Sequence, residues 1–296
     1  MKHHKSINKI IASVLWPLTL SYFLLLSTAA IAAPSGTPET RQLKPAVQSV
    51  MVKKSPGMTY AMKNISLIYH DGKIYNDAKQ PDENDAYCLC RYPVFYGQKS
   101  STPVNNIIEA SIAESLRLGE QKSKGESLDI LTKQFLKEYD AFKKERKSEL
   151  PYQFDLNGKV LLNRSGVLTL GLYTTAYTGG AHGSNHTEYL VFDTESGRRL
   201  RLQDVFVKGF EKRLNQFIDA RFRKMMGLSK TERLDSEKGS LFKNSIQFNQ
   251  NFALTNKGVS FLYNEYEIAA YVYGETEVDL SYKELAGILK HEYSLL

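Results

Sequence analysis

The residues of this sequence that could do chemistry are concentrated in one stretch, residues 173–206, which reads YTTAYTGGAHGSNHTEYLVFDTESGRRLRLQDVF. If the part HGSNHTEY is extended, His182, His186 and Glu188 point to one face, because side chains alternate along a strand. Two imidazoles and a carboxylate are competent zinc ligands, and an open fourth position would permit metal-assisted hydrolysis. A metal-dependent hydrolase that uses these three residues is therefore one hypothesis.

The glycines of the same stretch favour a different interpretation. Gly179, Gly180 and Gly183 predict a turn that needs positive φ or close backbone approach, and such a turn interrupts the alternation. A histidine in a turn of this kind commonly hydrogen-bonds to backbone. The sequence contains no His-Glu-x-x-His helix pattern, nucleophile elbow, phosphate loop or dinucleotide fingerprint. We therefore expect a structured binding loop, with no catalysis, metal or cofactor.

Tyrosines and acidic residues supply the candidate binding surface. Tyrosine offers a large amphipathic contact area at low entropic cost and is enriched at interfaces, although it is equally at home in sheets. We expect the loop of residues 177–186 to lie beside the segment YNEYEIAAYVYG. The candidate binding residues are Tyr177, Gly179, Gly180, His182, His186, Tyr263, Glu265, Glu267 and Tyr271.

The amino terminus has the layout of a secretory signal. Three lysines precede an apolar run from Ile10 to Ala33, and Ala30-Ile31-Ala32 is a small-x-small cleavage pattern. We expect residues 1–32 to be removed and the protein to be periplasmic. An uncleaved membrane anchor is the alternative, since the run is long enough to span a bilayer. Without residues 1–32 the formal charge is 36 − 32 = +4, and this mild excess argues against nucleic acid as a partner.

The only two cysteines, Cys88 and Cys90, lie two positions apart. An oxidising compartment favours a disulfide. Residues two apart on a strand, however, hold their Cβ atoms too far apart for comfortable bridging. The pair is expected to be either two partly buried thiols or a strained local disulfide, without a catalytic role.

The hydrophobic patterns predict the order of the elements. Residues 33–57 are proline-rich and indicate a flexible tether, and strands are expected around residues 58–70 and 86–97. Apolar residues at helical spacing then predict amphipathic helices over residues 102–118 and 125–150. From residue 151 antiparallel hairpins are expected, with turns at Asn157-Gly158 and Ser196-Gly197.

A third amphipathic helix and a last group of strands complete the expected order. Residues 210–226 predict a helix whose inner side carries Phe210, Leu214, Phe217, Phe222 and Met225. A hairpin at residues 256–258, a final strand and a short helix that begins with a Ser281–Glu284 capping box follow. The fold class is therefore α+β, with antiparallel sheets, amphipathic helices packed on one side, and two intimately docked subregions at residues 58–150 and 151–296.

Two stretches carry a resemblance to a known family. YTGGAHGSNHTEYLVFDTESGRRLRLQDVF and FALTNKGVSFLYNEYEIAAYVYGETEVDLSYKEL resemble the bacterial extracytoplasmic domain family found in the outer part of the lysozyme-sensing anti-sigma factor RsiV. Upstream, CRYPVFYGQKSSTPVNNIIEASI resembles the domain that precedes the catalytic domain of the peptidoglycan deacetylase PdaC. The resemblance implies a two-part α+β module outside the cytoplasmic membrane that is used for binding.

The resemblance has limits that shape the expected function. Nine residues precede the apolar run and no deacetylase domain follows, so neither an anti-sigma role nor esterase chemistry is carried over. We expect a non-catalytic binding protein that recognises a lysozyme-type cell-wall hydrolase as inhibitor, sensor or immunity factor. A peptidoglycan-binding accessory module is the alternative. Membrane contact is expected only through an uncleaved signal segment.

Overall fold

The computed structural model describes residues 57–76, 81–117, 125–146, 150–294 and 296. The expected signal peptide, and the tether apart from its last residue, lie outside the described residues. In these described residues, nine strands form two sheets, of six and three strands. Within the described residues, no helix is both long and apolar enough to cross a membrane.

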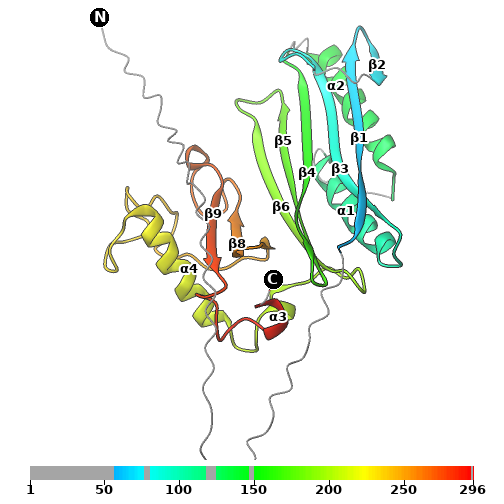
Figure 1. Cartoon of the computed structure of the whole chain (residues 1–296). Coiled ribbons are helices and arrows are strands. Elements are labelled where there is room, and N and C mark those ends of the chain that lie inside the picture. Colours follow the sequence, from blue (N-terminus) through cyan, green and yellow to red (C-terminus); the bar gives the residue numbers. More distant parts are fainter. Residues whose placement is uncertain (1–56, 77–80, 118–124, 147–149, 295) are drawn as a thin grey trace, which may run out of the picture. The chain divides into compact units, whose positions relative to one another are not determined.

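The larger sheet has the strand order β2-β1-β3-β4-β5-β6 (Figure 1). Burial alternates along β3, so that Cys88, Cys90 and Tyr92 face the helices while their neighbours face away. This period of two is what a sheet with one packed face requires. The strands are β1 (Thr59–His70), β2 (Lys73–Asn76), β3 (Ala86–Tyr96), β4 (Tyr152–Arg164), β5 (Val167–Thr178) and β6 (Ser184–Asp193).

One strand pair of this sheet is parallel. β3 and β4 run in the same direction, with Cys90 opposite Leu156, whereas the other pairs are antiparallel. A parallel pair needs a long crossover connection. Here α1 (Ser101–Ser115) and α2 (Leu128–Arg146) form it, and their apolar sides pack on the sheet face that carries Cys90. The predicted helices on one side of a sheet are thus confirmed, and the crossover is the reason for them.

The predicted turn at Asn157-Gly158 is wrong. β4 continues through these residues, and the chain turns instead at Ser165-Gly166, where both φ angles are positive. Gly158 is needed for packing, because a Cβ there would lie 3.1 Å from the Cα of Tyr92 on β3. The glycine that suggested a hairpin turn therefore serves instead to let the parallel strands β3 and β4 lie close together.

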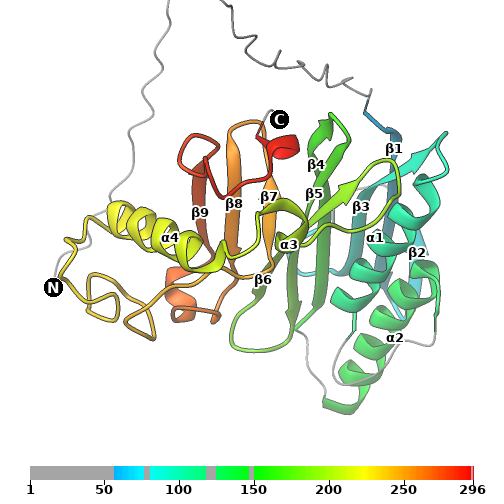
Figure 2. The same ribbon diagram turned by 90° about the horizontal axis from the view of Figure 1, so that it is seen from below.

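The smaller sheet has the order β7-β8-β9 and covers a second core with α4. Its strands are β7 (Phe252–Leu254), β8 (Gly258–Tyr263) and β9 (Thr276–Ser281), and the predicted hairpin at residues 256–258 joins the first two. α4 (Glu211–Met226) buries Leu214, Ile218 and Phe222, but Met225 is exposed rather than on the inner side. Figure 2 shows β7 as the strand of this sheet nearest β6.

The helix predicted after β9 does not form. Ser281 and Glu284 make the capping-box bonds, since the hydroxyl and the backbone N–H of Ser281 both donate to Glu284 Oε2, at 2.5 and 2.8 Å. The residues that follow make only consecutive turns. Gly287 has φ +87, a left-handed conformation that no helix interior adopts. A correct start signal was therefore followed by too few helical residues.

The fold class is α+β, as predicted, with mostly antiparallel sheets. The larger sheet contains strands from both sides of residue 150, so the expected boundary falls between β3 and β4 of one sheet. The two cysteines on β3 are free and fully buried. Burial, followed by the hydrogen bond with Cys90, raises the pKa of the Cys88 thiol well above its usual value. Two inert core thiols are what such a position favours.

Candidate functional site

The loop of residues 179–183 joins β5 to β6. Gly179 has φ +80, and a Cβ on Gly183 would lie 3.1 Å from the carbonyl oxygen of Ala176. Gly180 has neither feature, but its carbonyl oxygen accepts a 2.9 Å hydrogen bond from the Tyr177 hydroxyl. The predicted structured turn is confirmed, and two of its three glycines are required by backbone geometry.

This loop contacts the tyrosine-rich segment that follows β8, as the sequence predicted. The rings of His182 and Tyr271 are stacked with their centroids 4.0 Å apart, and the Tyr271 hydroxyl donates a 3.1 Å bond to the carbonyl of Gly183. The ring of Tyr266 also stacks with that of Tyr271, and their centroids are 5.7 Å apart. We call the three rings of His182, Tyr271 and Tyr266 the aromatic stack.

The turn of residues 264–267 holds the outermost ring. Tyr266 has φ +64, a left-handed conformation that is strained for a bulky residue, and it is 58% exposed. Glu267 Oε2 accepts a hydrogen bond from the backbone N–H of Asn264 at 2.9 Å. The carboxylate of Glu265 accepts two from Asn185: one from its side-chain amide at 2.9 Å and one from its backbone N–H at 3.1 Å. Side chains on either side of Tyr266 therefore fix a turn that presents an aromatic ring to solvent.

Two asparagines attach the same region to the free edge of β6. Asn264 Oδ1 accepts the backbone N–H of Thr187 at 2.7 Å, and Asn251 Oδ1 accepts that of Tyr189 at 2.7 Å. Both side-chain amides donate to the carbonyl oxygen of Thr187, at 2.8 Å from Asn251 and 3.2 Å from Asn264. An edge strand needs such protection, and side chains here replace the missing neighbouring strand. Sequence reasoning missed both asparagines, because no local pattern marks them.

Residues 265–279 carry five carboxylates: Glu265, Glu267, Glu275, Glu277 and Asp279. Each accepts a hydrogen bond from a neutral group, and within the described part of the chain none takes part in an ion pair. No lysine, arginine or histidine occurs in residues 258–282. Burial, and next the hydrogen bond to Glu277, raise the pKa of the Tyr189 hydroxyl, which keeps it a donor. The region is acidic within a chain of formal charge +7.

The predicted site residues divide into three groups. Tyr177, Gly179, Gly180, His182 and Tyr271 form the loop and the aromatic stack, with Glu265 and Glu267 holding the adjoining turn. Tyr263 is buried in the core of the smaller sheet, where its hydroxyl donates to the carbonyl of Gln247 at 2.6 Å. His186 is exposed on β6, opposite Thr174 of β5. Tyr266 belongs to the surface, although its spacing gave no reason to single it out from the other tyrosines.

The arrangement required for the metal alternative is not found. His182 lies before β6 and stacks on Tyr271, and its Nδ1 lies 2.7 Å from the carbonyl oxygen of Gly183. Glu188 forms a 2.9 Å ion pair with Arg199. Among the residues whose positions are described, no three His, Cys, Asp or Glu side chains are grouped so as to hold a metal ion. The turn at the glycines breaks the strand alternation on which that hypothesis depended.

Two family models match the chain. The one described as "Protein of unknown function (DUF3298)" matches residues 203–283, and "Deacetylase PdaC" matches residues 81–185. The chain therefore contains one region similar to the DUF3298 model and a preceding region similar to the PdaC model. The DUF3298 range contains α4, the smaller sheet and the turn that carries Tyr266. The PdaC range begins before β3 and ends in β6.

Two solved DUF3298 structures share the fold of this chain. A family member from Bacteroides fragilis is 19% identical, with a TM-score of 0.62, and the match covers 81% of this chain and 96% of that one. A family member from Pseudomonas aeruginosa is 21% identical, with a TM-score of 0.60 and coverage of 80% and 96%. None of the curated proteins matches significantly. The similarity therefore establishes the architecture of this chain but not its function.

Proposed function

We propose that this protein is an exported, non-catalytic binding protein whose aromatic stack captures a basic protein, namely a lysozyme-type cell-wall hydrolase. Export to the periplasm rests on the signal pattern of residues 1–32. The observation that carries the binding role is the conformation of Tyr266. A strained backbone that is fixed by its neighbours and presents an exposed aromatic ring is typical of a pre-organised contact.

The surroundings of the stack suit a protein partner. Val272 and Tyr273 are exposed beside Tyr271, at 81% and 51%, and extend the apolar surface. Aromatic residues at the centre of an interface contribute most of the binding free energy, and those with few rotatable bonds lose little entropy when they bind. Groups of exposed large apolar side chains mark protein-binding sites on many proteins, and these residues would supply such a site.

The charge that we expect of the partner follows from the five carboxylates of residues 265–279. Like net charges slow the encounter of two proteins, so a basic hydrolase would be repelled by this chain as a whole. The carboxylates around the stack have only neutral hydrogen-bond partners, and their charge therefore remains available to attract a cationic surface. Local complementarity of this type governs association rate and salt dependence.

The test measures binding of a c-type lysozyme to the purified protein by calorimetry, beside co-sedimentation with purified peptidoglycan. Tyr266→Gly removes the ring but suits the left-handed backbone, so it should weaken lysozyme binding at least tenfold without unfolding the turn. Tyr75→Gly, on β2 of the other sheet, is the matched control and should bind as the wild type does. Affinity should also fall as salt rises from about 50 to 300 mM, because screening weakens exposed charges.

Glu265 and Glu267 are poor probes of charge, since both hold the turn and their reversal would disturb Tyr266 itself. Absence of lysozyme binding at low salt, or unchanged affinity of Tyr266→Gly, would overturn the proposal. Co-sedimentation with peptidoglycan that is lost in Tyr266→Gly would assign the stack to glycan binding instead.

A further inference from the structure

We infer that the outer edge of β9 is a second binding site, which accepts an extended, lysine- or arginine-rich segment of a partner protein by strand addition. The site is separate from the aromatic stack. It uses the backbone of the smaller sheet, and it is assigned by the hydrogen bonds that this sheet leaves unmade.

The pairing of β7 with β8 identifies the free groups of β9. Thr255 donates to the carbonyl of Gly258 at 2.9 Å, so Gly258 and every second residue after it direct their backbone groups toward β7. The alternate residues of β8 must then bond β9, through Thr276, Val278 and Leu280. Glu277 and Asp279 consequently direct their N–H and C=O groups to the outer edge.

Nothing in the described parts of the chain bonds to these four backbone groups. β9 pairs with β8 alone, and no isolated bridge reaches it. The edge is closed only at its end, where Glu284 accepts the N–H of Ser281 at 2.8 Å. An open edge of this kind is a template for another strand.

The outer edge of β6, in the larger sheet, is protected, in contrast to that of β9. Side chains of Asn251, Asn264 and Glu265 occupy the outward N–H groups at residues 185, 187 and 189. Farther along β6, the N–H of Leu200 donates to the carbonyl of Val191 at 2.7 Å. The contrast indicates that the outer edge of β9 is left open for a partner.

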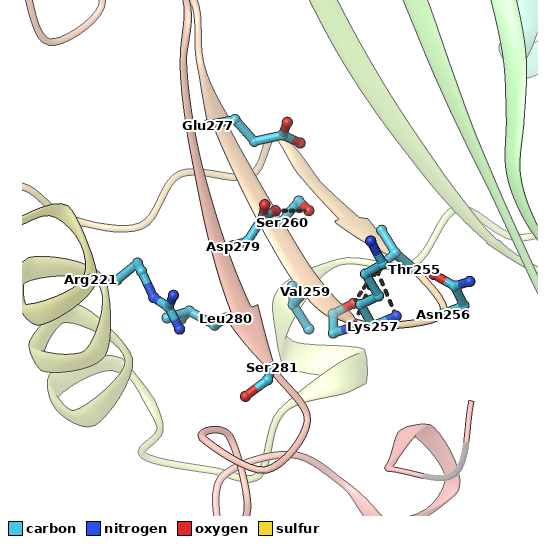
Figure 3. A pocket seen from close by; sticks show the side chains of 11 residues that line it. Arg221, Thr255, Asn256, Lys257, Val259, Ser260, Glu277, Asp279, Leu280 and Ser281 are labelled. Carbon is cyan, nitrogen blue, oxygen red and sulfur yellow. Dashed lines mark hydrogen bonds between the residues drawn. The ribbon is translucent and has the colours of Figure 1, made fainter. Parts of the chain in front are cut away.

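A recess of about 410 Å³ beside this edge is lined by residues of β9, of β8 and of the turn between β7 and β8, among them Lys257 (Figure 3). Glu277 and Asp279 line it from β9 together with Ser260 of β8, and the Ser260 hydroxyl donates to Asp279. Because side chains two apart on a strand share a face, both carboxylates lie beside the same side of an incoming strand. Arg221 of α4 lines the recess too, but it is engaged by Glu284 at 2.5 Å.

The two carboxylates select the occupant. Opposite charges directly across two strands stabilise their pairing and like charges oppose it. A strand with lysine or arginine at alternate positions would therefore place its cations against Glu277 and Asp279. Pairing with the same strand of a second copy would bring acids against acids, so self-association through this edge is disfavoured.

The probe is an acetylated and amidated nine-residue peptide of alternating lysine and valine, with a glutamate-for-lysine peptide as its control. Two further peptides carry N-methyl groups on the lysine or on the valine nitrogens. Directly opposed residues of an antiparallel pair exchange their bonds, so lysine methylation should block antiparallel addition and valine methylation should block parallel addition. Amide hydrogen exchange at Glu277 and Asp279 reports where the peptide binds.

We expect the lysine peptide to bind at low salt, to slow exchange at both amides at least tenfold, and to lose at least tenfold in affinity on methylation of one of the two sets of nitrogens. Asp279→Pro removes an outward N–H that β8 does not use, so it should abolish the protection while β8 and β9 stay paired. Glu277→Gln with Asp279→Asn should weaken binding about tenfold and flatten its salt dependence.

Three results would overturn the inference. They are no binding at millimolar lysine peptide, equal binding of both methylated peptides, and concentration-dependent dimers that Asp279→Pro abolishes. The outcome is independent of the lysozyme test, because Tyr266→Gly leaves this edge intact and should not alter binding of the peptide.

Discussion

Asn251 and Asn264 should stabilise this protein together by more than the sum of their separate contributions. Each amide accepts one backbone N–H of β6, from Tyr189 and Thr187 respectively, and both donate to the single carbonyl oxygen of Thr187. Thr187 is 2% and Tyr189 4% exposed, so water cannot easily replace a lost partner. The shared carbonyl is what couples the two side chains.

The magnitudes follow from the groups that each variant leaves unpaired. Asn251→Ala or Asn264→Ala leaves one buried N–H without a hydrogen-bond partner, which lowers the free energy of unfolding by about 1–3 kcal/mol. In either single variant the carbonyl of Thr187 keeps one donor. The double variant also leaves the carbonyl of Thr187 without a donor. Its loss of unfolding free energy should therefore exceed the sum of the two single losses by roughly 1 kcal/mol.

Urea denaturation of the wild type, both single variants and the double variant gives the coupling free energy directly. Asn256→Ala, at the exposed tip of the β7–β8 turn, is the control and should change stability by less than about 0.5 kcal/mol. Asn264→Asp keeps the acceptor for Thr187 but loses the donor, so it should cost less than Asn264→Ala. Strict additivity, or a double variant less destabilised than the sum, would refute the shared-carbonyl explanation.

Three further outcomes are expected. Gly158→Ala should lower the free energy of unfolding by about 1–3 kcal/mol in urea melts, because its Cβ would press on Tyr92; an unchanged midpoint would show that β3 and β4 can separate freely. Tyr266→Gly should be more stable than Tyr266→Ala by about 1 kcal/mol in the same assay, since only alanine keeps the left-handed strain; equal stabilities would mean that the turn carries none. The hydrogen bond to Asp140, then burial, raise the pKa of Tyr69 to about 12. The folded state thus holds this proton more tightly than the unfolded state, so the associated stability is complete below about pH 10 and is lost as pH rises toward 12. Tyr69→Phe should accordingly lose less stability between pH 9 and 11 than the wild type does, and equal losses would contradict the assignment.

Part of the candidate surface was predictable because it is encoded locally. The glycines of residues 179–183 indicated a structured turn, and Gly179 has the positive φ that they predicted. The contact between this turn and the tyrosine-rich segment was predicted, and the stack of His182 on Tyr271 confirms it. Which tyrosines lie at the surface was not predictable, because Tyr263 and Tyr266 differ by burial and backbone conformation rather than by sequence pattern.

Two predictions were wrong because they too depended on contacts between distant parts of the chain. Asn157-Gly158 has the composition of a hairpin turn, yet Gly158 serves the close approach of β3 to β4, which is a contact between distant parts of the chain. Met225 has the spacing of a core residue on α4 but is exposed, while the next residue, Met226, packs against the core. Periodicity gives the inner side of a helix only approximately, and tertiary packing decides which of two adjacent residues is buried.

The sequence by itself determined the fold class, the helices on one side of the sheet, and the turn that carries the candidate loop, because these depend on periods of two and 3.6 and on residues with special backbone freedom. Tertiary structure alone decided the parallel pairing of β3 with β4, the protected edge of β6 and the open edge of β9. The bonds between Asn185 and Glu265 join residues 80 positions apart. Such pairs form only after packing has brought two sheets together, and for that reason no local sequence pattern predicts them.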